Sequence, residues 1–450
     1  MSNIELILIL VGSICLLLFM VLKLKIQAFI ALLTTSVFLG FATGMSMDSI
    51  IKSIAEGMGS TLGFVATIIG IGAIFGQMLE SSGGAVSLAH YLTRRFGKDK
   101  APYALVATGF IVAIPIFLDV GFIMLVPILY ALAKDSGKSL LYFAIPLLAG
   151  LAVTHSFVPP TPGPVATAQI IGADLGWVIL FGFIIGIPVA IIAGPVFGKY
   201  ISRKIHIEVP PTFETPDDKI INNLPSFRQI ISIIAVPMLL ILLNTASTVW
   251  SAARGLEDIF WVKLFAFIGH PFIALLIATF LAIYFLGVKR GFTKDSILQL
   301  STKALAPAGL IILITGAGGV FKQLLIDSGI GLQLAESFSH SALPPIVMAY
   351  LLALIIRISQ GSATVAMITS AGIMAPVLMS FALSEPHKAL IVIAIAAGAT
   401  TASHVNDSGF WLVGKYLGMN EKQTLQSWTV METIISVVGF SLALLLSFFF

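Results

Sequence analysis

The stretch Gly398-Ala-Thr-Thr-Ala-Ser-His-Val-Asn-Asp-Ser-Gly-Phe-Trp411 places a run of polar side chains between two apolar regions. An earlier stretch, Ala152-Val-Thr-His-Ser-Phe-Val-Pro-Pro-Thr-Pro-Gly-Pro164, does the same in the first half of the chain, and its Thr154-His155 pair corresponds to Ser403-His404. In hydrocarbon, each polar group costs free energy unless it is paired or faces a wet cavity. Two matched polar breaks in an apolar chain are typical of a transporter site formed between two repeats.

The composition indicates a polytopic membrane protein. Of the 450 residues, 58% are hydrophobic and 10% are charged, whereas a soluble protein carries about 25% charged residues. The formal net charge of +4 comes without a long basic run, so we expect no nucleic-acid partner. The single cysteine, Cys15, excludes an intramolecular disulfide and a cysteine metal cluster.

The chain contains apolar segments close to the ~20 residues that a bilayer requires. They lie at 4–22, 26–44, 59–80, 176–198, 229–248, 264–287, 304–326 and 427–450. We expect the first to be a retained span rather than a cleaved signal peptide, because no basic region precedes it and Lys23 and Lys25 follow it. Two longer apolar regions, 102–172 and 344–413, are interrupted by Gly, Pro and charged residues, which predicts re-entrant hairpins and discontinuous helices.

An internal repeat divides the chain. The stretch Gly70-Ile-Gly-Ala-Ile-Phe-Gly-Gln-Met-Leu-Glu-Ser-Ser-Gly83 parallels Gly316-Ala-Gly-Gly-Val-Phe-Lys-Gln-Leu-Leu-Ile-Asp-Ser-Gly329. The Gly70-x-Gly72 pair lacks the spacing of a nucleotide-binding loop and fits close helix packing better. We predict leader transmembrane helices at 1–56, a first repeat at 57–200, a cytoplasmic linker at 201–227, connecting helices at 228–302 and a second repeat at 303–450.

Basic residues predict that the two repeats have opposite orientations. Four of them lie at 94–100, after Gly83, whereas the equivalent segment after Gly329 has none. If the N-terminus is outside, the basic clusters at 23–25, 94–100, 134–138, 199–204 and 289–303 all face one side, which is then the cytoplasm. The predicted fold is therefore an all-α polytopic membrane protein with two inverted-topology repeats, re-entrant hairpins and discontinuous helices.

Ionisable residues inside the apolar regions are the first candidates for function. Asp119 lies near the tip of the first predicted hairpin, whose counterpart is Ser359–Thr364. It could cap the N-terminus of a half-helix, but intramembrane carboxylates usually face a pathway, so a role in binding substrate or the coupling ion is favoured. His155 and His404 occupy matched positions, where hydrogen bonding alone and contact with substrate or protons are equally consistent with the sequence. Two histidines without a further ligand do not form a metal site.

Arg357 and Asp407 flank the second hairpin tip and the second polar break. Arg357 could bind a substrate carboxylate, neutralise Asp407 or Asp119, or reach water at an interface, and we favour the structural pairing. Burial favours the protonated form of a carboxyl group. We therefore predict Asp407 as the proton carrier, with Asp119 as the second candidate.

The chemistry around the breaks suits a small carboxylate that bears hydroxyl groups. The proline-rich stretch 159–164 cannot continue a helix, so the half-helix that follows points its N-terminus inward, where free N–H groups and the helix dipole attract anions. Hydroxyl side chains nearby are suited to a polyol. The predicted substrate contacts are Asp119, Thr154, His155, Ser156, Thr161, Ser362, Thr364, Ser403, His404, Asn406 and Ser408.

Three motifs carry a resemblance to a known family. The stretches Phe117-Leu-Asp-Val-Gly121, Thr154-His-Ser-Phe-Val-Pro-Pro-Thr-Pro-Gly-Pro164 and Ser403-His-Val-Asn-Asp-Ser-Gly409 resemble signatures of the gluconate permease family, and the resemblance covers essentially the whole chain. It implies a symporter of the bacterial cytoplasmic membrane that takes up gluconate or a related acid with protons and needs no cofactor. Members also carry other sugar acids and D-serine, so the substrate stays open, as does assembly into a homo-oligomer.

Two other classes of protein compete with this interpretation. An intramembrane enzyme could use Asp119, Asp407 or a histidine as acid and base, but the sequence offers no metal-ligand set, no Ser/His/Asp arrangement that can be placed and no cofactor motif. A channel would be expected to show rings of charge or a carbonyl filter, and neither is evident. We therefore expect a transporter and not an enzyme.

Overall fold

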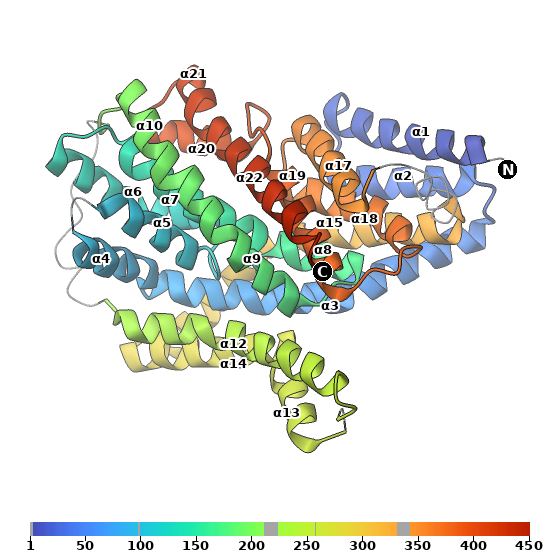
Figure 1. Ribbon diagram of the computed structural model, residues 1–450, viewed down its shortest axis with the longest axis horizontal. Helices are drawn as coiled ribbons and strands as arrows, with labels where there is room; N and C mark the ends of the chain where they lie inside the picture. Colours follow the sequence, from blue (N-terminus) through green and yellow to red (C-terminus); the bar gives the residue numbers. More distant parts are fainter. Residues whose placement is uncertain (1–2, 98–99, 211–223, 257, 331–342) are drawn as a thin grey trace.

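The computed structural model describes residues 3–97, 100–210, 224–256, 258–330 and 343–450 (Figure 1). Within these ranges all regular structure is helical. Among the described residues, seven helical segments are long and apolar enough to cross a membrane: Met47–Ser81, Leu141–Ile171, Leu175–Lys204, Phe227–Ala252, Pro271–Arg290, Lys294–Asp327 and Glu421–Leu446. The predicted all-α membrane fold is confirmed.

Two long helices, α3 (Met47–Ser81) and α15 (Lys294–Asp327), contain the two copies of the glycine-rich repeat and pack against each other. A Cβ added at Gly57 would lie 2.7 Å from the carbonyl oxygen of Gly319, so only glycine allows the two backbones to approach this closely. Ser53 near the start of α3 donates a hydrogen bond to Asp327 at the end of α15, and Gly70 lies beside Leu305. The matched helices therefore run antiparallel, as an inverted repeat requires.

Both helices begin earlier than the apolar pattern predicts. Side-chain caps start them, because Ser46 Oγ accepts from the Ser49 N–H at 3.2 Å and Thr293 Oγ1 accepts from the Ser296 N–H at 3.1 Å. The first turns of both helices are polar, so a prediction from hydropathy alone assigns them to a loop. The expected starts at 59 and 304 are thus too late.

Each half contains a helical hairpin, as predicted. In the first, α5 (Ala101–Val112) is joined to α6 (Leu118–Ser136) through residues 113–117. In the second, α17 (Pro345–Gln360) is joined to α18 (Ala363–Leu378) through Gly361, whose φ of 79° is left-handed. A Cβ at Gly361 would also collide with the carbonyl oxygen of Asn406, so this tip lies directly against the second polar break.

Each half also contains a discontinuous helix, again as predicted. The first consists of α7 (Leu141–Phe157) and α8 (Pro162–Ile171), and the second of α19 (Glu385–Thr400) and α20 (Ser408–Leu417). The halves pack together between these elements, because α8 contacts α18 and α15, and α19 contacts α9 (Leu175–Ile191) and α8. Figure 1 shows α8, α15 and α18 converging near the centre of the molecule.

The connecting region differs from its prediction. The expected single span at 264–287 is divided at Gly269 and His270, where α13 (Phe260–Ile268) ends and α14 (Pro271–Ala282) begins. Pro271 has no N–H to continue the helix, and His270 Nδ1 accepts from the Phe272 N–H at 3.4 Å, so the sequence caps a new helix there. In Figure 1, α14 lies beside α12 (Phe227–Ala252) along one edge of the molecule.

The remaining helical elements belong to the leader segment, the two halves and the connecting region. They are α1 (Asn3–Leu22), α2 (Ala28–Ala42), α4 (Gly84–Phe96), η2 (Ile192–Val196), α10 (Phe197–Lys204), η3 (Ile283–Gly287), η4 (Val288–Arg290), α21 (Glu421–Thr424), η5 (Leu425–Thr429) and α22 (Val430–Leu446). Much of the predicted linker and most of the 330–343 segment lie outside the described residues.

Candidate functional site

The tip of the second hairpin and the second polar break form one unit. His404 Nε2 donates to the carbonyl oxygen of Ile358 at 3.1 Å, and Asn406 Nδ2 donates to the same oxygen at 2.9 Å. This carbonyl belongs to the last turn of α17, where helical carbonyls lack intrahelical partners. Two of the predicted substrate residues therefore also cap a helix end.

A buried ion pair lies at the centre of this unit. Arg357 Nη2 is 2.5 Å from Asp407 Oδ2, and the two side chains are 3% and 15% exposed. Arg357 also donates to the carbonyl of Gly361 at the hairpin tip. The sequence left three roles open for Arg357: binding substrate, neutralising an aspartate or reaching water. In the structure Arg357 pairs with Asp407.

Asp407 receives donors from several directions. Ser403 Oγ donates to its Oδ2, and the Gly409 N–H donates to Oδ1 at 3.0 Å, which makes Asp407 the N-cap of α20. Ser403 in turn accepts from Trp428 Nε1 at 2.7 Å. Asp407 therefore accepts from three donors, one of them a guanidinium.

Sequence reasoning missed Glu432 on α22. Its side chain is buried, and its Oε1 has no hydrogen-bond partner among the described residues. It interacts electrostatically with Arg357 and Asp407, so it belongs to the same neighbourhood. The signal that could have found it is a single acid in the otherwise apolar final span, the same signal that identified Asp119.

The first polar break lies in a more apolar setting. Thr154 Oγ1 donates to the carbonyl of Phe110 at 2.8 Å, and Thr161 Oγ1 donates to that of Val158 at 2.7 Å. Ser156 is buried. A cavity of about 20 Å³ lies between the first hairpin tip and this break, which is room for about one water molecule and too small for a sugar acid.

Asp119 occupies the first turn of α6, but it is not the N-cap, which is Phe117. The capping interpretation of Asp119 is therefore wrong. His155 interacts electrostatically with Asp119 and with Asp407. The Nδ1 atom of His155 has no partner among the described residues.

Other predicted residues take up more ordinary positions. Ser362 caps α18 by accepting from the Val365 N–H at 3.4 Å. Thr364 is half-buried in the first turn of α18, and Ser408 is exposed at the start of α20. The structure thus gathers Ser362, Ser403, His404, Asn406 and Asp407 around the second hairpin tip, whereas Thr154, Ser156 and Thr161 stay with the first break.

Unpartnered buried polar atoms concentrate on the helices around the two breaks. Among the described residues they include His155 Nδ1, Thr167 Oγ1, Arg357 Nε, Gln360 Oε1 and Nε2, Thr369 Oγ1, Ser370 Oγ and Glu432 Oε1. Buried polar groups are normally paired, and exceptions call for a partner such as water, an ion or a ligand. The arrangement can therefore bind a polar molecule with many hydrogen-bonding groups.

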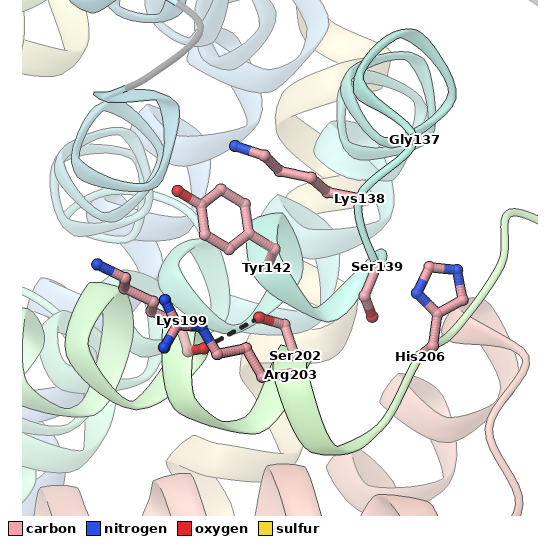
Figure 2. Close-up of a pocket in the computed structure, with 8 residues that line it drawn as sticks. All are labelled: Gly137, Lys138, Ser139, Tyr142, Lys199, Ser202, Arg203 and His206. Atoms are coloured by element: carbon pink, nitrogen blue, oxygen red, sulfur yellow. Dashed lines mark hydrogen bonds between the residues drawn. The ribbon is translucent and has the colours of Figure 1, made fainter.

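A separate basic pocket of about 370 Å³ lies at the ends of the transmembrane helices (Figure 2). Lys138, Lys199, Arg203 and His206 line it, and Figure 2 shows them around Tyr142 and Ser202. Lys138 Nζ lies 4.6 Å from the centre of the Tyr142 ring. The pocket contains no predicted substrate residue, and it brings two of the predicted basic clusters to one face.

Sequence comparisons identify relatives along the whole chain. The family model described as GntP family permease matches residues 4–449. The low-affinity gluconate transporter of Escherichia coli (strain K12) is 40% identical over 439 residues, covering 98% of this chain and 97% of its own. The gluconate permease of Pseudomonas aeruginosa is 42% identical and covers 94% of each chain, and the Gnt-II system L-idonate transporter of Escherichia coli is 38% identical and covers 96% of each.

Solved structures share the fold at low sequence identity. MtrF of Neisseria gonorrhoeae, from a class of antimetabolite efflux pumps, superimposes with a TM-score of 0.64 at 14% identity over 88% of this chain and 84% of its own. The YdaH transporter of Alcanivorax borkumensis, described as having an unusual topology, gives 0.61 at 13% identity over 88% of both chains. These two similarities bear on the fold alone.

Proposed function

This chain belongs to the GntP permease family and is a multi-pass membrane transporter, and from that premise we propose that it takes up gluconate or a closely related sugar acid in symport with protons. Its relatives are named as transporters and permeases, not as enzymes. We further propose the bacterial cytoplasmic membrane as its location, with the N-terminus outside.

One observation carries the proposal of a sugar-acid substrate. Buried polar atoms without partners surround the two broken helices, and they include both donors and acceptors. A sugar acid brings one carboxylate and several hydroxyl groups, each of which can donate and accept. Such a ligand can satisfy several of these atoms at once, whereas an apolar ligand would leave them unpaired.

The proposed substrate contacts are those predicted from the sequence. They are Asp119, Thr154, His155, Ser156, Thr161, Ser362, Thr364, Ser403, His404, Asn406 and Ser408. Gln360 joins them, because both polar atoms of its buried side chain lack partners among the described residues. The exposed Asn406 and Ser408 lie at the rim of the second break, where an entering substrate is met first.

The charge of the proposed substrate calls for a driving cation, and we propose a proton. Moving one negative charge inward against an inside-negative potential costs about 2.3 kcal/mol per 100 mV. A proton moving with the anion makes that step electroneutral. The sequence predicts Asp407 as the proton carrier and Asp119 as the alternative.

Transport by purified protein in sealed proteoliposomes tests the proposal. We expect saturable counterflow of unmodified labelled gluconate, and uphill uptake when the external pH is lowered. Unlabelled L-idonate, other sugar acids and D-serine as competitors identify the preferred substrate. A chemically modified product would indicate an enzyme, non-saturable flux would indicate a channel, and uptake unaffected by a pH gradient would contradict proton coupling.

A further inference from the structure

We propose that Glu432, and not Asp407, is the group that carries the coupled proton, and that Asp407 serves as the permanent counter-ion of Arg357. This inference rests on the proposed proton symport and assigns it to a residue.

The two carboxyl groups have opposite environments. Asp407 is held by Arg357, Ser403 and the Gly409 N–H. Protonating it would leave the buried guanidinium of Arg357 without its counter-ion, and an unpaired buried charge is unfavourable. Glu432 is 4% exposed and has an oxygen without any partner among the described residues. Burial without a partner favours the neutral, protonated carboxyl group.

The other helices packed against α22 leave Glu432 few titratable neighbours. The helix α9 and the segments η2 and η5 carry none, and α17 contributes Arg357 and Tyr350. The helix α7 contributes Tyr142 in its first turn and His155 in its last turn. Tyr350 is engaged with Ser436, about one turn further along α22. The charged residues of α19 lie at its start, where His387 contacts the Ser447 carbonyl at the far end of α22. The charges that act on Glu432 are therefore those of Arg357 and Asp407.

Counting charges explains why proton and anion would move together. Arg357 and Asp407 cancel, so the local charge is set by Glu432. When Glu432 is protonated, a substrate carboxylate enters a neutral site beside a guanidinium whose Nε lacks a partner among the described residues. When Glu432 is ionised, the same carboxylate meets an uncompensated negative charge in a poorly screened interior. Proton binding therefore strengthens substrate binding, and by linkage the reverse also holds.

The position of Glu432 connects its protonation to the second break. It follows the π-helical segment η5, a type of irregularity that is frequent at functional sites. Trp428 and Thr429 of η5 both bind Ser403, through its hydroxyl and its carbonyl respectively. A change of charge at Glu432 thus acts one turn away from contacts that position the break.

Glu432→Gln tests the assignment, because it keeps the shape of the side chain and removes its titration. We expect the variant to retain measurable gluconate counterflow, whose rate no longer rises as the pH falls, and to lose uphill uptake driven by a pH gradient. Proton entry on addition of gluconate, measured with a trapped pH dye, should disappear as well. Glu421→Gln, on the exposed helix α21, is the matched control and should behave like the wild type.

The outcomes separate the two proposals. If Glu432→Gln still accumulates gluconate with proton entry, Glu432 is not the carrier, although symport itself stands. If the wild-type protein shows no proton-driven uptake of any sugar acid, the proposed function fails and this assignment fails with it. If Glu432→Gln does not reach the membrane, Glu432→Asp is measured instead: coupling with a displaced pH profile supports the assignment, and an unchanged profile overturns it.

Discussion

Arg357 at the end of α17 and Asp407 at the start of α20 are joined by a 2.5 Å ion pair that connects the second hairpin tip to the second polar break. Arg357→Gln and Asp407→Asn should each lower the stability of the protein by about 3–5 kcal/mol, because each leaves one buried charge unpaired. The double variant should be more stable than the sum of the two losses implies. Thermal unfolding of the purified protein in detergent measures this, and strictly additive losses would show that the pair contributes nothing specific.

The glycine crossing between α3 and α15 yields a second prediction. Gly57→Ala and Gly319→Ala place a methyl group against the opposing backbone, and overpacking of this kind costs about 1–3 kcal/mol. The control is Gly59→Ala on the same helix, where an added Cβ meets nothing within 4 Å. We expect lower melting temperatures for the first two variants and an unchanged melting temperature for the control. Equal behaviour of Gly57→Ala and Gly59→Ala would contradict the close crossing.

The orientation of the repeats can be tested at matched loops. Ser136, before the α6–α7 connection, and Ala382, before α19, are both exposed and occupy corresponding places in the two halves. Single cysteines at these positions, in a Cys15→Ser background, should react with an impermeant maleimide from opposite sides. We expect Ala382→Cys to be labelled on intact cells and Ser136→Cys only after the membrane is opened. Labelling of both from one side would rule out the inverted arrangement.

Substrate contacts can be tested by alanine variants of Thr154, Ser403, His404 and Asn406. Loss of a buried hydrogen bond to a substrate group costs about 1–3 kcal/mol, so we expect roughly tenfold weaker uptake. Asn406→Ala is the most informative, because its side chain is exposed and its carbonyl partner at Ile358 keeps the hydrogen bond from His404. Uptake is normalised to the amount of protein in the membrane. Unchanged kinetics in all four variants would remove these residues from the site.

The sequence predicts those features that are determined by residues close together in the chain. The breaks at 158–161 and 401–407 and the two hairpin tips could be found because Pro, Gly and polar residues interrupt apolar runs. The division of the predicted 264–287 span was missed because Gly269-His270-Pro271 acts through capping, which hydropathy does not register. The polar first turns of α3 and α15 were missed for the same reason.

The sequence could not predict which side chains from distant helices contact one another in the fold. The choice of Asp407 over Asp119 as partner of Arg357 depends on how α17 meets α20. Glu432 was overlooked because the sequence does not show which residues surround a single acid in an apolar span. Burial favoured a carboxylate as proton carrier, and Asp407 ranked first because the second break holds the most hydroxyl and amide groups. That ranking could not include which donors reach Asp407 or that an oxygen of Glu432 has no partner among the described residues.

The crossing of α3 and α15 has a mechanical consequence. Where two backbones touch at Gly57 and Gly319, there are no intervening side chains whose rotamers could adjust, so the contact resists both sliding and bending. The second hairpin tip is held by polar contacts instead, through the Ile358 carbonyl and through the ion pair between Arg357 and Asp407. A change of charge alters polar contacts such as those at the second tip, whereas it does not alter the backbone contact between α3 and α15.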